Sequence, residues 1–181
     1  MLTGFGRLFF HSHNLKLTKL LFSSSGNTGT LKLQITDAPS NLNISKAFVT
    51  ISSIEVHKAS TNSTNETNET NFTTGWITVV QGPISYDLIA IKDVKEILGS
   101  KELNAGKYTQ IRLNVDSARV TIDGNESSLT VPSDKIKLIH PFTIEAGKTI
   151  TLTLDFNASE SIKSTGKNKY ILQPTIKVIQ G

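Results

Sequence analysis

The chain has 181 residues, of which 37% are hydrophobic and 19% are charged, and it contains no cysteine. This apolar content is enough for one domain with a buried core, and the lack of cysteine excludes disulfide bonds, thiolate catalysis and cysteine-ligated zinc. Most of the net charge of +4 comes from residues 1–30, where Arg7, Lys16 and Lys19 meet no acidic residue. The remainder is nearly neutral and lacks the basic clusters of nucleic-acid-binding domains.

The first 29 residues are predicted to form a tail and linker ahead of a folded domain over residues 30–181. Residues 23–29 (SSSGNTG) have the composition of a flexible linker. Residues 15–19 (LKLTK) alternate apolar and polar positions, as a strand does. The apolar stretches of the tail are too short for the hydrophobic region of a signal peptide or for a membrane-spanning helix.

The domain is predicted to consist of short β-strands. Leu31, Leu33 and Ile35 alternate with polar residues up to a turn at 37–39. Asp123-Gly124 is a strong hairpin signal, and Pro174 indicates an edge strand or a bulge. The further predicted strands cover residues 47–57, 75–80, 108–115, 119–122, 128–131, 135–139, 149–156 and 169–179.

One short helix is predicted just before Gly99. Apolar residues at spacings of one to three share one helical face there; they are Ile89, Ile91, Val94, Ile97 and Leu98. Eight or nine short strands with one short helix are typical of a single, mainly antiparallel β-sandwich. The strands do not alternate with full-length helices, which argues against a doubly wound parallel sheet.

Seven sequons for N-glycosylation occur along the chain. Residues 61–74 (TNSTNETNETNFTT) hold four in phase, at Asn62, Asn65, Asn68 and Asn71. Three isolated ones, close to the number expected by chance, lie at Asn43, Asn125 and Asn157. Residues 59–74 are therefore predicted to be an exposed loop that carries glycans, and a low-complexity loop grown by repeat slippage is the alternative.

No motif of a known catalytic or cofactor site is found, so the chain is predicted to be no enzyme and to need no cofactor. A nucleophile elbow, a phosphate loop and a zinc-protease helix are all missing from the sequence. His11 and His13 have no carboxylate nearby, so no metal site is predicted. Strand-end carboxylates form the catalytic pair of glycosidases, but turn caps are commoner; the candidates are Asp37, Asp87 and Asp155. For His57 and His140 a structural role is also favoured.

An isopeptide cross-link is a further hypothesis for a β-sandwich without cysteine. Such a bond needs a lysine beside an asparagine or aspartate, with an acid to move protons. The candidates are Lys32 and Asp37 on the first strand of the domain, with Asn157 or Asp155 on a late strand.

The tail also has the features of a donor strand. An extended alternating segment, a hinge and a compact body together suit strand addition to a neighbouring copy. Repeated head to tail, that contact makes a filament. The side chains that would fill the neighbour's groove are Leu15, Leu17, Leu20 and Phe22. A disordered leader is the alternative.

Several segments carry a resemblance to a known family. They are residues 29–33 (GTLKL), 35–39 (ITDAP), 49–57 (VTISSIEVH), 75–76 (GW), 106–112 (GKYTQIR) and 152–156 (LTLDF). Together they resemble a family of uncharacterised secreted domains from archaea and bacteria that opens with GTLxLxITDAP. The resemblance implies a transthyretin-like (prealbumin-like) sandwich and export, and implies no activity. More loosely, a glycosylated, cysteine-free sandwich with a donor-like tail is similar to the subunits of archaeal thread filaments.

The predicted function is therefore that of a non-catalytic, N-glycosylated structural or assembly protein. It is expected outside the cell or on its surface, with copies of itself or other surface proteins as partners and no nucleic acid. A carbohydrate- or peptide-binding module is the alternative, with Trp76 and Tyr86 as sugar-stacking residues. Ligand binding predicts an exposed aromatic pair beside a pocket, assembly predicts an unpaired strand edge, and catalysis predicts facing buried carboxylates.

Overall fold

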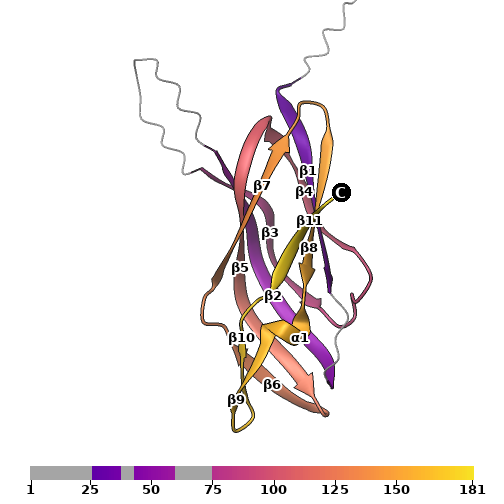
Figure 1. Ribbon diagram of the computed structural model, residues 1–181, viewed down its shortest axis with the longest axis vertical. Coiled ribbons are helices and arrows are strands. Elements are labelled where there is room, and N and C mark those ends of the chain that lie inside the picture. The colour runs from indigo at the N-terminus through magenta and orange to yellow at the C-terminus, as the bar shows by residue number, and fades with distance from the viewer. Residues whose placement is uncertain (1–25, 38–42, 60–74) are drawn as a thin grey trace, which may run out of the picture.

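Two β-sheets packed face to face make up the computed structural model, which describes residues 26–37, 43–59 and 75–181 (Figure 1). One sheet has the order β11-β8-β1-β4, with β1 (Thr28–Asp37), β4 (Glu96–Asn104), β8 (Thr149–Phe156) and β11 (Ile176–Gln180). The other has the order β3-β2-β5-β6-β10-β9, and β7 also pairs with β5. Its strands are β2 (Ile44–Lys58), β3 (Trp76–Asp87), β5 (Gly106–Ile122), β6 (Asn125–Thr130), β7 (Lys135–Ile144), β9 (Ile162–Gly166) and β10 (Lys169–Leu172).

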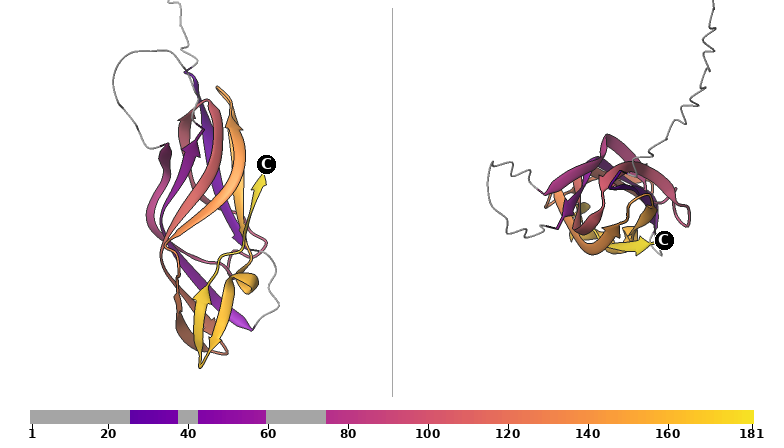
Figure 2. Two further views of the ribbon diagram at one scale, coloured as in Figure 1. Left: turned by 60° about the vertical axis from the view of Figure 1, so that its left-hand side comes forward. Right: turned by 90° about the horizontal axis from the view of Figure 1, so that it is seen from above.

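This arrangement confirms the predicted β-sandwich. Seen from above, the two sheets surround a common interior (Figure 2). Most strand pairs are antiparallel, but β1 with β8 and β6 with β10 are parallel. The described residues contain eleven strands, more than the eight or nine predicted. They include no helix long and apolar enough to cross a membrane.

The core begins with the alternation in β1. Leu31, Leu33 and Ile35 are fully buried, whereas the residues between them are half-buried on the outer face. Leu33 and Ile35 lie in register with Leu152 and Leu154 of β8, so the two strands present one apolar surface. Burying each such side chain contributes about 1.5–3 kcal/mol. The buried face therefore requires apolar residues at alternate positions, and this alternation predicted the strand.

The strand β5 changes partner along its length. The predicted strands 108–115 and 119–122 are one continuous strand of 17 residues. Its edge away from β2 pairs with β7 over Gly106–Asn114 and with β6 over Ala118–Ile122. The predicted hairpin between β5 and β6 is confirmed, because Asp123 and Gly124 both adopt positive φ, at 49° and 78°.

The helix predicted around residues 89–98 is wrong. Residues 88–95 form turns, and β4 begins at Glu96 and pairs with β1. Asp93 has a φ of 59°, which an α-helix does not accept, and Val94 and Ile97 are exposed. A short apolar run is compatible with a helix or a strand. Here the hydrogen-bonded pairing with β1 stabilises a strand from Glu96 onward. The one helix among the described residues is α1 (Ala158–Ser161).

Pro174 lies where the chain crosses from one sheet to the other. The single strand predicted over residues 169–179 is two strands, since β10 pairs in the larger sheet and β11 in the smaller. β11 is an edge strand of its sheet, as the proline indicates.

Two buried tyrosines make stability sensitive to alkaline pH. Burial raises the pKa of Tyr108, whose hydroxyl donates to the Asn104 carbonyl at 2.9 Å. Burial, and then the charge of Glu96, raise the pKa of Tyr86. The folded state thus holds these protons more tightly than the unfolded chain, so this contribution is complete below pH 10.0 and falls as the pH rises above it. Urea unfolding between pH 8 and 11 is expected to show this decline, and Tyr108→Phe should flatten it; an unchanged slope in the variant would contradict the assignment.

Candidate functional site

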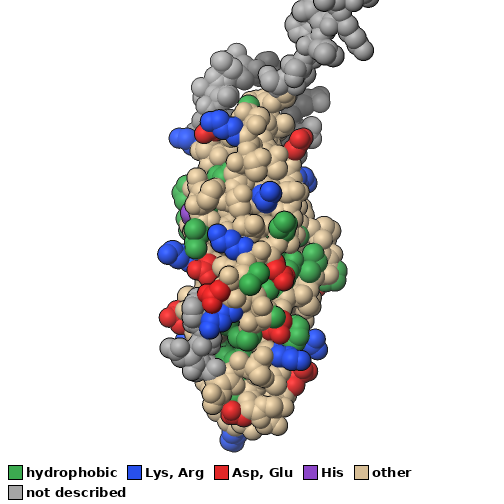
Figure 3. Space-filling view, turned by 90° about the vertical axis from the view of Figure 1, so that its right-hand side faces the viewer, with side chains coloured by type: hydrophobic (Ala, Val, Ile, Leu, Met, Phe, Trp, Pro, Cys, Tyr) green, Lys and Arg blue, Asp and Glu red, His purple; other side chains and the backbone are tan. Residues whose placement is uncertain are grey.

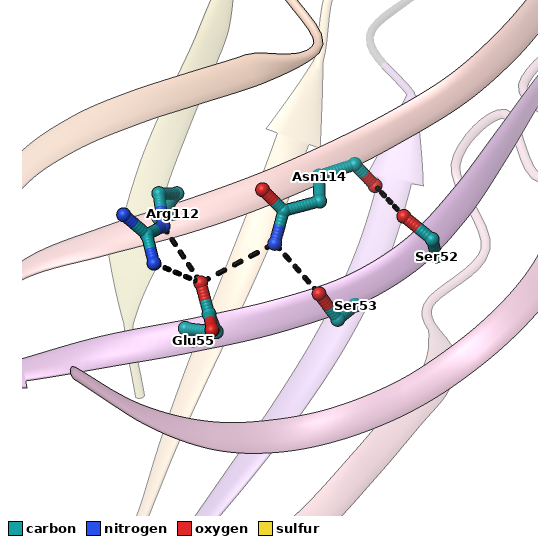
Figure 4. Close-up of polar contacts among 5 residues, drawn as sticks. All are labelled: Ser52, Ser53, Glu55, Arg112 and Asn114. Carbon is teal, nitrogen blue, oxygen red and sulfur yellow. Dashed lines mark hydrogen bonds and ion pairs between the residues drawn. The ribbon is translucent and has the colours of Figure 1, made fainter.

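A cluster of polar side chains lies on the outer face of the larger sheet, across β2 and β5 (Figure 4). Glu55 and Arg112 are direct register partners, as are Ser53 and Asn114. Oε2 of Glu55 accepts from Nε of Arg112 at 2.6 Å and from Nδ2 of Asn114 at 3.3 Å. The same Asn114 amide donates to Ser53 Oγ at 2.6 Å. We call these four residues, with Ser52, the polar cluster.

An aromatic residue extends the polar cluster towards β3. The guanidinium carbon of Arg112 lies 4.1 Å from the ring centre of Trp76, in cation–π geometry. His57 meets the same indole edge-on, with 5.0 Å between ring centres. The Arg112 and Glu55 side chains are only 20% and 18% exposed, so their ion pair is much less screened than a surface pair.

A hollow of about 320 Å³ opens beside the polar cluster. It lies where the pairing partner of β5 changes from β7 to β6 and where β2 carries a bulge. Asp116, Asp134 and Lys135 complete its rim. Oδ1 of Asn114 is buried and has no hydrogen-bond partner among the described residues. Hydroxyl, amide, carboxylate and ammonium groups therefore surround a space that suits a small polar ligand.

No metal chemistry is indicated at this hollow. Within residues 26–37, 43–59 and 75–181, no three His, Asp or Glu side chains are grouped so that they could hold a metal ion. His11 and His13 lie outside these ranges.

The aromatic pair proposed for sugar stacking is not assembled. Trp76 is half-buried beneath Arg112, whereas Tyr86 is only 7% exposed and belongs to the core. They lie ten residues apart on β3, which corresponds to about 33 Å along a strand. Any ligand bound at the hollow therefore does not stack on both.

Two of the three strand-end carboxylates accept hydrogen bonds from backbone amides. Asp37 Oδ1 accepts from the Ala158 amide at 2.8 Å, and Asp87 Oδ1 accepts from Ala47 and Ile89 amides at 3.0 and 3.2 Å. Asp155 lies on β8 opposite Lys177. His57 contacts Trp76, and Nε2 of His140 is buried without a partner among the described residues.

The lysine proposed for an isopeptide bond is far from its partners. Lys32 lies in register with Thr151, whereas Asp155 lies in register with Thr36. The four-residue offset is about 13 Å along the sheet, and Asn157 lies further still. Lys32 also faces outward while Asp37 faces the core, so this hypothesis was wrong.

The edges of β7 and β11 form a second candidate site, which we call the open seam. β7 pairs only with β5 and β11 only with β8, so each keeps one unpaired edge among the described residues. Core-facing side chains remain half-buried there: Ile136, Leu138, Ile150, Ile176 and Val178. A pocket of about 200 Å³ lies at one end, between the end of β7, the start of β8 and Gly181. Figure 3 faces the side of the molecule where the smaller sheet lies, and it shows separate hydrophobic side chains among charged ones at mid-height.

The opposite side of the sandwich is closed. There β3 and β4 are the edge strands, and Lys101 Nζ of β4 donates to the Thr78 carbonyl of β3 at 2.7 Å. Gly99 lies so close to Val80 that an added Cβ would stand 3.0 Å from the valine side chain. Side chains thus bridge the two sheets on this side, although β3 and β4 also keep one edge each without a ladder partner among the described residues.

The predicted glycosylation sites divide into two groups. The tandem sequons at Asn62, Asn65, Asn68 and Asn71 lie outside the described residues, as do the donor residues Leu15, Leu17, Leu20 and Phe22. Asn43 and Asn125 are exposed, whereas Asn157 is half-buried and caps α1. Because His57 of β2 pairs with Trp76 of β3, the tandem sequons connect two adjacent strand ends.

The fold and its sites define a two-sheet β-sandwich protein with a polar outer cluster and one open seam. The model of the domain of unknown function DUF4382 matches residues 28–174, and the chain belongs to this family. The match begins with β1, so the predicted resemblance to an uncharacterised domain family is confirmed at that level. No curated protein and no solved structure matches the chain.

The polar cluster is expected to stabilise the larger sheet. Glu55→Ala should lower the free energy of unfolding by about 1–3 kcal/mol, because Arg112 and Asn114 both lose an acceptor in a partly buried site. Glu126→Ala is the matched control, since its contact with Arg119 spans 3.9 Å between side chains more than half exposed. It should change stability by less than about 0.5 kcal/mol. Equal effects in urea unfolding would contradict a structural role for the cluster.

Proposed function

We propose that this protein is a non-catalytic, exported and N-glycosylated β-sandwich subunit that assembles by strand addition. In this proposal the N-terminal tail of one copy is the donor and the open seam of the next copy is the acceptor. The observation that carries it is that, among the described residues, β7 and β11 each keep an unpaired edge beside half-buried apolar side chains. The proposed location is outside the cell or on its surface.

The open seam offers the two things that an added strand needs. Its edges carry backbone N–H and C=O groups that have no ladder partner in the described part of the chain, and such edges are templates for pairing with another chain. Leu138 and Val178 face the core but stay half-buried. A strand laid over them would remove apolar surface from water, at about 25 cal/mol per Å².

The tail has the matching pattern. Leu15 and Leu17 fall on one face of an extended strand, with Lys16 between them on the other. Leu20 and Phe22 join the first face only if a bulge between Leu17 and Leu20 shifts the register by one residue. Residues 15–22 would span about 26 Å as a strand, against about 33 Å for the ten residues of β7. One donor segment is therefore long enough to cover most of the seam.

The position of β1 favours exchange between copies. Gly147 donates to the Thr28 carbonyl and Thr30 to the Lys148 carbonyl, both at 2.8 Å, so the chain enters β1 beside the β7–β8 turn. A tail that continued outward from this end of the sandwich would reach a neighbour without reversing. A head-to-tail contact of that kind repeats without closing and gives a filament. The proposed assembly would in this respect be similar to that of archaeal thread subunits.

Export is supported by composition and by the described sequons. Ser, Thr and Asn make up much of the polar composition, as is common in exported proteins, and the chain carries four sequons in phase between β2 and β3. Asn125 is exposed at the start of β6. A β-sandwich with such sequences on its surface is a suitable acceptor for glycans once it meets the export machinery.

Engineered cysteines test the proposed contact without background, because the chain has none. Under mild oxidation, Leu17→Cys combined with Val178→Cys should give a ladder of disulfide-linked multimers on a non-reducing gel. Leu17→Cys with Ile179→Cys is the matched control, since Ile179 is the neighbouring residue on the outer face of β11. No ladder in the first variant, or equal ladders in both, would contradict strand addition at the open seam; a cross-linked monomer would mean that the tail fills its own seam.

The hollow beside the polar cluster favours a second function, the binding of a carbohydrate. It is lined by groups that donate hydrogen bonds to hydroxyls, such as the Lys135 ammonium, and by groups that accept from them, such as the Asp134 carboxylate and Oδ1 of Asn114. The test is binding to an array of neutral oligosaccharides. Asp134→Ala should weaken binding at least tenfold while Glu126→Ala leaves it unchanged, and an array without signal would exclude this function.

A further inference from the structure

The three isolated sequons have different folded environments, and we infer that the folded protein accepts a glycan at Asn125 but not at Asn43 or Asn157. The inference rests on the proposed function, because it requires the chain to meet a glycosyltransferase. Such an enzyme must reach the asparagine amide and the hydroxyl two residues later together. All three residues of a sequon must therefore be able to detach from the folded domain and enter the active site of the enzyme.

Asn125 satisfies this condition. It is exposed and directly follows the two-residue turn between β5 and β6. The middle residue Glu126 is also exposed, and only Ser127 is half-buried. Residues 125–127 pair with the last three residues of β5, at the free end of a hairpin. Strand ends of this kind open locally at low free-energy cost.

Asn157 is held by its own sequon. Its Oδ1 accepts from Ser159 Oγ at 2.7 Å and from the Glu160 amide at 3.0 Å, which caps α1. The middle residue Ala158 is fully buried, and its amide donates to the buried Asp37 carboxylate. The hydroxyl that a transferase needs is therefore already engaged. Its release would unwind α1 and pull Ala158 out of the core.

Asn43 is exposed, but the residues after it are not free to move. Ile44 is 8% exposed, belongs to the core cluster and pairs with Ile122 of β5. Ser45 Oγ donates to the Thr121 carbonyl at 3.3 Å. A transferase could bind this sequon only after the first residue pairs between β2 and β5 had separated. Exposure of the asparagine alone thus does not make the site.

The transfer step is a nucleophilic substitution at the anomeric carbon of the sugar donor. The Nδ2 atom of Asn125 forms a bond to the anomeric carbon of an oligosaccharide linked to a lipid phosphate. The bond from that carbon to the phosphate oxygen breaks, Nδ2 loses one proton, and the lipid phosphate leaves as an anion. The fold selects the site by deciding which Nδ2 can reach the donor.

The test uses the unglycosylated full chain, an oligosaccharyltransferase and its lipid-linked oligosaccharide, with site occupancy read by glycopeptide mass spectrometry. In the folded chain, Asn125 should be modified at least tenfold more than Asn43 or Asn157. Short peptides containing each sequon are the control, and all three should be accepted. Ser127→Ala should abolish modification at Asn125, and Ser127→Thr should retain it.

Two results would overturn the inference. One is modification of Asn43 or Asn157 in the folded chain as readily as in their peptides. The other is rejection of the Asn43 or Asn157 peptide, because local sequence and not the fold would then exclude it. Neither result touches the proposed function, which fails instead if the protein from its native source carries no glycan at any of the seven sequons.

Discussion

Deleting residues 1–25 is expected to leave the sandwich folded and to abolish the proposed self-association. The first described strand begins at Thr28, and every pairing of β1 with β4 and β8 involves Thr28 or a later residue. The thermal midpoint of the truncated chain should therefore stay within a few degrees of the full chain. Sedimentation velocity and negative-stain microscopy should show multimers or filaments only for the full chain.

Two point variants make this prediction specific to strand addition. Leu17→Lys places a charge at the position proposed to enter the neighbour's apolar seam, and it should abolish association as the deletion does. Lys16→Ala lies on the other face of the same segment and should leave association intact. A truncated chain that still assembles would contradict the role of the tail.

Phe156→Ala is expected to have the largest effect on stability of any single substitution discussed. Phe156 is fully buried at the end of β8, between Asp37 of β1 and Ile176 of β11 in the register of the smaller sheet. Truncating a buried phenylalanine costs about 3–5 kcal/mol through lost transfer energy and the cavity left behind. Since a domain is stable by only about 5–15 kcal/mol, the variant should be close to unfolding at 25 °C.

The control is a truncation on the same sheet that opens no cavity. Ile97 of β4 is 64% exposed, so Ile97→Ala should change the free energy of unfolding by less than about 0.5 kcal/mol. Both variants can be compared by urea unfolding followed by circular dichroism. A Phe156→Ala variant as stable as Ile97→Ala would mean that the smaller sheet does not pack as described.

Local pattern was sufficient wherever one strand face is buried. The alternation of Leu31, Leu33 and Ile35 located β1, and the Asp123-Gly124 turn located the β5–β6 hairpin. The same reasoning failed for residues 89–98, because Ile97 and Val94 are apolar but exposed. A short apolar run does not distinguish a helix from an edge strand, and only the distant partner β1 decides between them.

The polar cluster could not be predicted because its contacts are long-range. Glu55 and Arg112 are 57 positions apart in the chain, and their meeting depends on the register of β2 against β5, which includes several bulges. The only local signal was that polar residues occupy the alternate positions of two strong strands. The open seam could not be predicted either, since an unpaired edge depends on the order of strands in a sheet and not on any one segment.

The measurement that tests the exported glycoprotein most directly is the intact mass of the protein from its native source, before and after chemical deglycosylation. The polypeptide alone accounts for 19.7 kDa. Glycosylation of the tandem sequons predicts a larger, heterogeneous mass that collapses to one polypeptide mass on treatment. A single mass explained by the polypeptide before any treatment would contradict it, and residues 59–74 would then be a polar loop without glycans.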